Sequence, residues 1–573
     1  NRVQRYLLED GDLTLVDEKP EANMGAASTL ADFLSWGVAN YPSERMGLIL
    51  WDHGSGSING VCFDEQYDYD SLTLGELDHA LNQVYNQMTD RFEFIGFDAC
   101  LMSTLETANV LTPYARYMYA SQEMEPGSGW DYTSLLNNLA ANPDQDGVQL
   151  GEKVCREYYD HCADYGFGSQ RSATFSIIDL SKIDDVLISM NEAFRVVYEQ
   201  GDLGDVTRAV LEADSFGGNS VSEGYSNMLD LGNMLDQLSG YGQEVRDASQ
   251  TLQSCVLYTM NGRLHKNASG LSVYYPVSIQ GSEELKIFSR ICPSNYYYAL
   301  IDKIAYGAEN GSAADYDNST LLSDMADINE WLGEESGFTG DVSTNAGEFA
   351  DIEIGQMGVS DIYFDEDGIY TVSFDNMDEL AYACCSVGMD DDADGFFYLG
   401  TTEEVIYDID RNCVTDNFDG LWPCINDNLL ALELVNTTDS CSIYTCNVLL
   451  NDEIETNLRI EYDWEYDEWS VIGIWDGIDE ETGMASREVY ELQEGDVITP
   501  AYYWFSVDDD EDWYYGDDIV VDGDLEITYE YLPEGVYYYC FELHDIYGNV
   551  YYTPFTLQYV DEDGEVWVDG EFY

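Results

Sequence analysis

Basic residues are scarce in this sequence. It has 21 lysines and arginines against 113 aspartates and glutamates in 573 residues, which gives a formal net charge of −92 at pH 7. Nucleic acids and anionic membrane surfaces would repel such a chain, so the charge excludes both as main partners. No lysine follows Lys303, and the arginines beyond it are Arg411, Arg459 and Arg487. The composition favours basic peptides, cations or a salty medium.

Long apolar stretches and zinc-type cysteine spacings are lacking as well. No run of 18 apolar residues occurs, so the sequence predicts no membrane-spanning helix, and no signal peptide is recognisable. None of the thirteen cysteines has the spacing of a zinc site. If one cysteine stays free, the other twelve could form disulfides in an oxidising compartment. The sequence does not determine which of them would pair. Candidates for pairing are Cys155, Cys162, Cys413, Cys424, Cys441 and Cys446. We expect structural or reduced cysteines rather than metal ligands.

Residues 1–306 alternate between strand and helix patterns. This alternation predicts an α/β domain with a mostly parallel sheet and helices on both faces. The expected strands are Gln4–Leu8, Gly47–Trp51, Phe92–Phe97, Tyr117–Ser121, Ala173–Ile178 and Leu271–Tyr275. The expected helices are Leu30–Asn40, Leu74–Met88, Leu101–Leu111 and Gly151–Tyr165.

The pattern changes in the second half of the chain. Residues 307–346 are rich in small and polar side chains and are interpreted as a linker or bridging segment. From residue 347 to 573 the periodicity becomes two, with aromatic and β-branched residues between turn signals. This predicts an all-β region of one or two sandwich domains. Such a region could bind a surface, a glycan or the first domain, or only pack and stabilise.

Two apolar runs end at reactive side chains. LILWDHGSG (48–56) leads to His53, and FIGFDACLM (94–102) leads to Cys100. Each reads as a buried parallel strand entering a loop, and catalytic groups gather beyond the carboxyl ends of such strands. A histidine about 50 residues before a cysteine is the arrangement found in caspases. The spacing therefore predicts a cysteine peptidase with a caspase-like sheet.

Several ordered segments of residues 1–275 resemble the clostripain family, which belongs with the caspases, legumains and gingipains. The matching segments are QRYLLEDGDL (4–13), TLADFLSWGVANYPSERMGLILWDHGSG (29–56), LTLGELDHAL (72–81), FIGFDACLMSTLETA (94–108), YASQEMEPGSGWDY (119–132) and ASGLSVYYP (268–276). In that family a strand and a helix precede the equivalent of QRYLL. The resemblance therefore implies a preceding segment that is cleaved off or held as a separate chain.

The chemistry expected at these residues is nucleophilic. Cys100 would attack as the thiolate, while His53 acts first as base and then as the acid that protonates the leaving amine. No third, orienting residue is evident. The family pattern pairs the backbone N–H of Gly54 with that of Cys100 as the oxyanion hole. In the alternative interpretation, His53 only caps a strand and Cys100 is a small core residue.

Specificity is expected to depend on Asp98. It lies two residues before Cys100, so both side chains would fall on one face of an extended segment, and a carboxylate there would select Arg or Lys at P1. In clostripain-like enzymes the aspartate at this position belongs to a basic S1 pocket, and Glu123 and Glu125 are expected to add charge at its rim. Alternatively, Asp98 is a buried acid held by loop N–H groups. The scarcity of lysine and arginine agrees with protection from self-digestion, or with solubility alone.

An acidic loop at residues 390–395 is a candidate calcium site. Asp390, Asp392 and Asp394 precede Gly395 as in the first half of a D-x-D-x-D-G loop, but Thr401 occupies the position of the final glutamate, so an EF-hand is excluded. A looser Ca²⁺ site and a solvated acidic turn stay open. The resemblance adds weight, since clostripain depends on Ca²⁺.

The sequence as a whole predicts a cysteine endopeptidase that cleaves peptides after Arg or Lys, with no organic cofactor. The resemblance and the acidic, tyrosine-rich composition imply an extracellular or cell-surface location. One alternative is a catalytically silent surface-binding protein that uses its acidic β domains. Another is a peptidase of the same clan with a different P1 preference, which Asp98 argues against.

Overall fold

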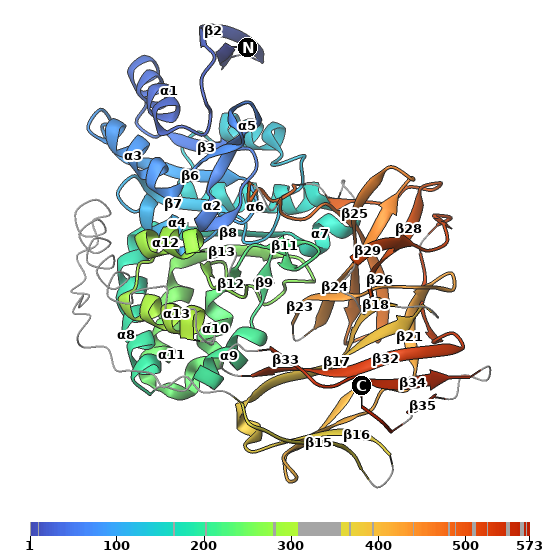
Figure 1. Cartoon of the computed structure of the whole chain (residues 1–573). Coiled ribbons are helices and arrows are strands. Elements are labelled where there is room, and N and C mark those ends of the chain that lie inside the picture. The colour runs from blue at the N-terminus through green and yellow to red at the C-terminus, as the bar shows by residue number, and fades with distance from the viewer. Residues whose placement is uncertain are drawn as a thin grey trace.

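The computed structural model describes two halves of the chain, an α/β half and a β-rich half (Figure 1). The described residues are 2–307 and 357–572, except 10, 164–166, 201–202, 279–281, 366–367, 392–394, 439, 480–481, 488, 507–510, 524, 546–549, 562–565 and 569. The expected linker at 307–346 lies outside these residues, apart from Gly307 at the end of the last helix of the α/β half. The domain boundaries drawn from the sequence therefore stay a prediction.

The α/β half is built on a mixed sheet with the order β13-β8-β7-β6-β3. Its strands are β3 (Gly47–Trp51), β6 (Phe92–Asp98), β7 (Ala115–Ala120), β8 (Thr174–Asp179) and β13 (Val256–Asn261). β3, β6 and β7 run parallel, whereas β8 and β13 pair antiparallel with their neighbours. Because β13 is antiparallel to β8, it runs in the same direction as β7, so β8 alone is reversed and the sheet is mixed with most of its strands in one direction. Its parallel part is the part that carries the catalytic motifs.

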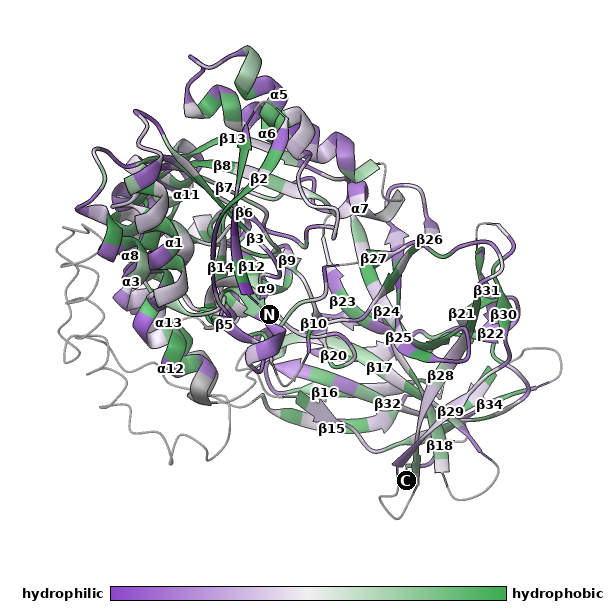
Figure 2. Cartoon of the chain, turned by 90° about the horizontal axis from the view of Figure 1, so that it is seen from above, coloured by the Kyte–Doolittle hydropathy of each residue, from purple (hydrophilic) through white to green (hydrophobic). Residues whose placement is uncertain are grey.

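Alternate residues of the central strands pack on opposite faces of the sheet, as the pleat requires. Phe94, Tyr119 and Phe175 belong to the core under the helices α5 (Tyr132–Ala141) and α6 (Gly147–Cys162), while Ile95 and Met118 belong to the larger core on the other face. Figure 2 shows hydrophobic residues along β7, β8 and β13. β6 and β8 are buried on both faces, which explains why their residues form continuous apolar runs in the sequence.

Helices cover both faces of this sheet, as expected. They are α1 (Ala27–Asn40), α2 (Gly56–Asn59), α3 (Leu74–Tyr85), α4 (Leu105–Leu111), α5 (Tyr132–Ala141), α6 (Gly147–Cys162), α7 (Phe167–Ser172), α8 (Ile183–Gln200), α9 (Leu203–Leu211), α10 (Leu231–Gln237), α11 (Gln243–Cys255), α12 (Ser282–Ile291) and α13 (Asn295–Gly307). Capping boxes fix two helix starts, Thr73 with Glu76 at α3 and Asp146 with Gln149 at α6.

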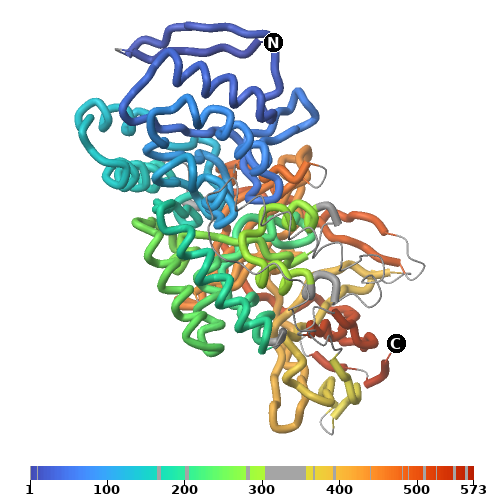
Figure 3. Tube along the Cα trace, turned by 90° about the vertical axis from the view of Figure 1, so that its left-hand side faces the viewer, coloured from blue at the N-terminus to red at the C-terminus, as the bar shows by residue number. Residues whose placement is uncertain are grey.

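Two expected strands lie outside the central sheet. The first, Gln4–Leu8, lies in β1 (Arg2–Glu9), which pairs with β2 (Asp12–Pro20) in a hairpin at one end of the molecule (Figure 3). The second, Leu271–Tyr275, corresponds to β14 (Ser272–Tyr274), which pairs with β12 (Met228–Asp230). β12 also pairs with β9 (Ser215–Phe216). A short apolar run indicates a strand but does not say which sheet it joins.

The second half consists of strands throughout its described part, with one short 3₁₀ turn, η7 (Met377–Glu379). The longest pairing path is β27-β26-β25-β24-β28-β18-β17-β32-β34-β35. The strands of this path are β17 (Leu380–Asp390), β18 (Gly395–Thr402), β24 (Cys441–Leu450), β25 (Ile454–Asp463), β26 (Glu468–Trp475), β27 (Val489–Tyr490), β28 (Val497–Ser506), β32 (Gly535–Asp545), β34 (Thr556–Val560) and β35 (Val566–Val568). The expected all-β region is confirmed, and its division into sandwiches stays a prediction.

The remaining strands extend these sheets or form small ones. They are β4 (Val61–Asp64), β5 (Asp70–Leu72), β10 (Asn219–Ser220), β11 (Gly224–Tyr225), β15 (Val359–Phe364), β16 (Tyr370–Phe374), β19 (Val405–Asp408), β20 (Cys413–Asp416), β21 (Leu421–Ile425), β22 (Asn428–Leu429), β23 (Glu433–Thr437), β29 (Glu511–Tyr515), β30 (Ile519–Val520), β31 (Ile527–Tyr531) and β33 (Val550–Tyr552). All thirteen cysteines of the chain lie in described segments and carry free thiols.

Buried ion pairs join the two halves. Arg459 of β25 donates to both carboxylate oxygens of Glu223, at 2.8 and 2.6 Å, and lies over the Trp475 ring. Glu461 of β25 accepts from Arg263 and Arg171 of the α/β half. Because a buried charge is tolerated only when it is paired, these contacts fix how β25 docks on the first half.

Candidate active site

His53 and Cys100 follow neighbouring strands at the same edge of the sheet. In the parallel pair β3 and β6, Trp51 lies opposite Asp98, so each reactive residue comes two positions after a paired residue. Gly54 packs against the backbone of Cys100, where a side-chain carbon would lie 2.4 Å from the Cys100 carbonyl oxygen. Only glycine permits this approach, which brings the two motifs together.

Cys100 is fully buried. Its Sγ accepts a hydrogen bond from the backbone N–H of Glu125, at 3.2 Å. Burial raises the pKa of the thiol to about 12, although Arg487 and the Glu125 N–H oppose this shift. Leu101 follows in the left-handed region with φ of 63°, which turns the chain sharply behind the nucleophile. In this arrangement the thiol is protonated and closed off from solvent.

His53 contacts a residue from the other end of the sequence. Its Nδ1 lies 2.9 Å from the carbonyl oxygen of Ala485. Since a carbonyl can only accept, Nδ1 carries the proton in this contact and Nε2 is left as the basic nitrogen. No local pattern could indicate this partner, because the two positions lie 432 residues apart in the chain.

Asp98 has no exposed surface and is surrounded by donors. Its Oδ1 accepts from Arg487 Nη2 at 2.7 Å, and its Oδ2 accepts from the Trp130 N–H at 3.1 Å and the Tyr132 hydroxyl at 2.8 Å. Gly129 closes over the carboxylate, because a side-chain carbon there would lie 2.5 Å from Oδ2. Asp98 is thus a buried acid held by a loop N–H group, as one interpretation expected, and it also pairs with a guanidinium of the same chain. Its role in binding a substrate's P1 side chain stays a prediction.

Glu125 lies beside Asp98, but it is buried rather than at a rim. Its Oε2 accepts from Trp130 Nε1 at 3.1 Å. Burial, reinforced by the nearby Asp98 carboxylate, raises the pKa of Glu125 well above its usual range. Glu125 is therefore enclosed next to Asp98, and the position at a solvent-facing rim that the sequence suggested is wrong.

The structure corrects the rim position expected for Glu123. This residue is buried, and its carboxylate accepts from the Gly217 N–H and lies 3.1 Å from His265 Nε2. Burial disfavours a charged His265, but ion pairs with Asp214 and Glu123 raise the pKa of His265 to about 10. Glu123 is therefore part of an internal ion-pair cluster. A lone histidine without a motif carries no sequence signal of such a role.

The calcium site expected at residues 390–395 is only partly covered. Asp390 ends β17, whereas Asp392 and Asp394 lie outside the described residues. Among the described residues, one group brings metal-type donors together: Cys384, Glu542 and His544 place one donor atom each within 4.8 Å of the others. These sulfur and nitrogen donors suit zinc better than calcium, and Glu542 already pairs with His544 at 2.8 Å. Pairing of β17 with β32 creates this group, which sequence spacing could not indicate.

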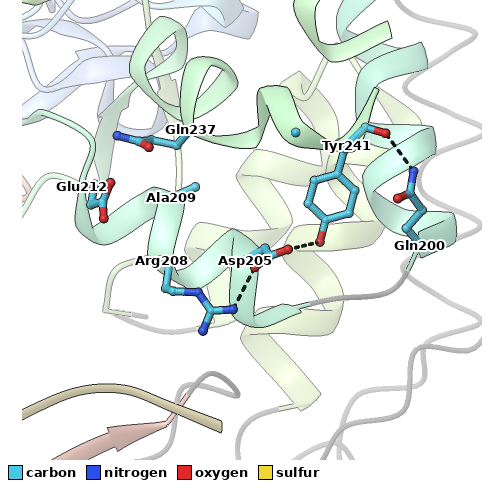
Figure 4. Close-up of a pocket in the computed structure, with 8 residues that line it drawn as sticks. Gln200, Asp205, Arg208, Ala209, Glu212, Gln237 and Tyr241 are labelled. Carbon is cyan, nitrogen blue, oxygen red and sulfur yellow. Dashed lines mark hydrogen bonds and ion pairs between the residues drawn. The ribbon is translucent and has the colours of Figure 1, made fainter. Parts of the chain in front are cut away.

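A polar hollow outside the catalytic motifs lies between α8, α9 and the turn η4 (Leu238–Tyr241) (Figure 4). Asp205 accepts from Arg208 at 2.8 Å and from the Tyr241 hydroxyl at 3.0 Å, so these groups satisfy one another. The lining residues include neither His53 nor Cys100. The catalytic motifs are therefore the better candidate site.

The fold and the Cys100 site together define a cysteine peptidase. Residues 4–310, more than half of the chain, match the clostripain family. The chain belongs to the clostripain family of cysteine peptidases. No described helix is long and apolar enough to cross a membrane.

Individual relatives match either a short stretch of the chain or a longer stretch at low sequence identity. Clostripain from Hathewaya histolytica is 30% identical over 156 residues, which cover 24% of this chain and 29% of that protein. A secreted C11 cysteine protease from Bacteroides thetaiotaomicron, in complex with an irreversible peptide inhibitor, is 18% identical, with a TM-score of 0.40 over 52% of this chain and 85% of that chain. An inactive zymogen C11 protease from Parabacteroides distasonis is 17% identical, with a TM-score of 0.38 over 52% and 83%.

Proposed function

We propose that this peptidase is an endopeptidase that cleaves after Arg or Lys through a Cys100–His53 dyad. The observation that carries the basic P1 preference is the guanidinium of Arg487 on the buried carboxylate of Asp98. This contact supports the proposal, because it places a guanidinium on a carboxylate two residues before Cys100. A lysine would present a single ammonium to the same carboxylate.

The proposed reaction uses groups at the ends of β3 and β6. His53 accepts the proton of Cys100, and the sulfur attacks the carbonyl carbon after the P1 residue. The oxyanion receives hydrogen bonds from the N–H groups of Gly54 and Cys100. His53 then protonates the leaving amine, and a water molecule activated by His53 hydrolyses the thioester. The close packing of Gly54 on the Cys100 backbone supports this placement of the two donors.

Two further features of the proposal rest on the sequence and the family. An extracellular or cell-surface location agrees with the strongly acidic composition and with basic peptides as substrates. A calcium ion at Asp390, Asp392 and Asp394 is supported by their spacing. Isothermal titration with Ca²⁺, before and after replacement of the three aspartates by Asn, tests that site directly.

Hydrolysis of fluorogenic peptides that differ only at P1 tests the proposed activity. Peptides ending in Arg, Lys, Asn, Asp or Ala are compared on wild type and on Cys100→Ala. Cleavage of only the Arg and Lys peptides, absent in the variant, is the expected result. Cleavage after another residue would keep the dyad and reject Asp98 as the P1 determinant. Cys100-independent cleavage would reject the dyad.

A further inference from the structure

A segment of the β-rich half lies across the catalytic groups of the α/β half. Between β26 and β27, Gly483, Ala485 and Arg487 each contact the site. The Gly483 carbonyl accepts from the Ser55 hydroxyl and from Asn59 Nδ2, the latter at 3.3 Å. The Ala485 carbonyl contacts His53, and Arg487 reaches Asp98. Gly483 lies in a tight turn with φ of 68°, and Ala485 pairs with Ile478 in an antiparallel bridge, so the returning arm of this turn lies against the catalytic groups.

We infer that residues 482–487 are an internal inhibitor, in which Arg487 occupies the pocket that a substrate's P1 side chain must enter. This inference rests on the proposed function of the same site. The Arg487 side chain is 6 % exposed and its partner Asp98 is 0 % exposed, so the pocket is full. A P1 arginine needs the same carboxylate, and therefore substrate and Arg487 exclude each other.

The inhibitory segment also covers the reacting groups. Its Ala485 carbonyl accepts the hydrogen bond from Nδ1 of His53. Arg487 Nη1 donates to the Asp52 carbonyl at 3.2 Å. Cys100 has no exposed surface in this arrangement. A peptide can reach the thiol only after the segment has moved, which makes the described arrangement a closed state.

The segment is anchored to both halves of the protein. Ser486 is tied to its own domain, where its N–H donates to the Gly477 carbonyl at 3.0 Å and its carbonyl accepts from Trp475 Nε1 at 3.0 Å. On the peptidase side, the Ile478 N–H donates to the Glu223 carbonyl at 2.7 Å. Opening the site therefore requires Ala485, which is buried in the core of the α/β half, to leave that core while the catalytic sheet stays folded.

Replacement of Arg487 by Met tests the inference, because Met keeps an apolar stem and removes the charge. If the closed state holds most molecules, apparent KM is raised by the inverse of the open fraction. We expect Arg487→Met to lower KM for a P1-Arg peptide about tenfold or more, with a smaller change in kcat. Arg411→Ala is the matched control, since it removes an exposed arginine of the same half and is expected to match wild type.

Alkylation of Cys100 by iodoacetamide gives a readout that does not need peptide hydrolysis. Trypsin releases Cys100 in the fragment Phe92–Arg116, which contains no other cysteine, so mass spectrometry can follow this thiol alone. We expect alkylation about tenfold or more faster in Arg487→Met than in wild type and Arg411→Ala. A merely structural Arg487 would lower the melting temperature of the variant without this gain.

The outcomes separate the inference from the proposed function. Equal alkylation rates and equal KM in wild type and Arg487→Met would overturn the internal inhibitor and leave the peptidase assignment intact. Faster alkylation without hydrolysis of any peptide would support the closed cleft and reject the proposed P1 preference. If Arg487→Met does not fold, Arg487→Gln is measured in the same way, and a folded variant with wild-type rates overturns the inference.

Discussion

The two halves of this protein contribute opposite charges to the same buried surfaces. The α/β half supplies Glu223 and Asp98, and the β-rich half supplies Arg459 and Arg487 as their partners. The two arginines differ in surroundings, because Arg459 lies against Trp475 and the Gly217 carbonyl, whereas Arg487 lies beside the nucleophile. The same ion-pair chemistry therefore serves docking at one position and occupation of the catalytic pocket at the other.

The largest expected effect is a loss of activity caused by a substitution in the α/β half. Replacement of His53 by Ala should reduce kcat about 10³-fold or more for any cleaved peptide, because the thiol loses its base. Steady-state hydrolysis of the best fluorogenic peptide measures this loss. His79→Ala, at an exposed histidine on α3 that contacts Gln83, should retain wild-type activity. Comparable activity of His53→Ala and wild type would reject the dyad.

The docking arginine should matter most for stability. Arg459→Met leaves Glu223 buried without its counter-charge, which is expected to lower the free energy of unfolding by about 3 kcal/mol. Urea and thermal unfolding measure the change. Arg487→Met should cost less, because Asp98 keeps its bonds from Trp130 and Tyr132. If the two variants were equally destabilised, the proposed difference between Arg459, which docks the two halves, and Arg487, which fills the catalytic pocket, would be rejected.

The acid of the catalytic pocket should control specificity. Asp98→Asn keeps the shape of the side chain and removes its charge, so kcat/KM for a P1-Arg peptide should fall about 100-fold, as expected for a lost charged hydrogen bond in a buried site. The same variant should change hydrolysis of a P1-Ala peptide little. Equal losses for both peptides would indicate a structural role for Asp98.

The smallest expected effect is a pH dependence of stability at the internal cluster. The pKa of His265 is about 10 in the folded protein and about 6.5 in an unfolded chain. Its ion pairs with Glu123 and Asp214 therefore stabilise fully below pH 6.5, and this contribution is lost as pH rises through about 10. Chemical unfolding measured from pH 6 to 10 should show that the free energy of unfolding of the wild type falls with pH. The fall should be smaller in His265→Gln. A parallel decline in both proteins would contradict this role.

Local sequence patterns predicted the parallel strands at the site closely. The expected Gly47–Trp51 coincides with β3, and Phe92–Phe97 is one residue shorter than β6. Strands that are buried on both faces appear in the sequence as continuous apolar runs, so the ends of each run mark the ends of the strand. The helix expected from Leu101 begins only at Leu105, because Leu101 adopts φ of 63° and Thr104 caps the helix. A sharp turn directly after a nucleophile is a place where helix propensity gives way to the geometry of the site.

Contacts between distant residues could not be predicted in this way. Glu123 and Glu125 look alike in the sequence, yet Glu123 pairs with His265, whereas burial and the nearby Asp98 raise the pKa of Glu125. Whether a carboxylate is charged depends on burial and on partners supplied by other elements. Cys384, Glu542 and His544 likewise meet only through the register of β17 and β32.

The sequence by itself determined the family, the peptidase class and the order of the two halves, because apolar runs and motifs act over short distances along the chain. The tertiary structure alone decided that β8 runs opposite to the other strands of its sheet, that Glu123 is internal and that Arg487 lies on Asp98. These features depend on which surfaces can bury charge together after the chain has folded. Pairing across 389 residues leaves no local trace, since burial and charge neutralisation act through space rather than along the backbone.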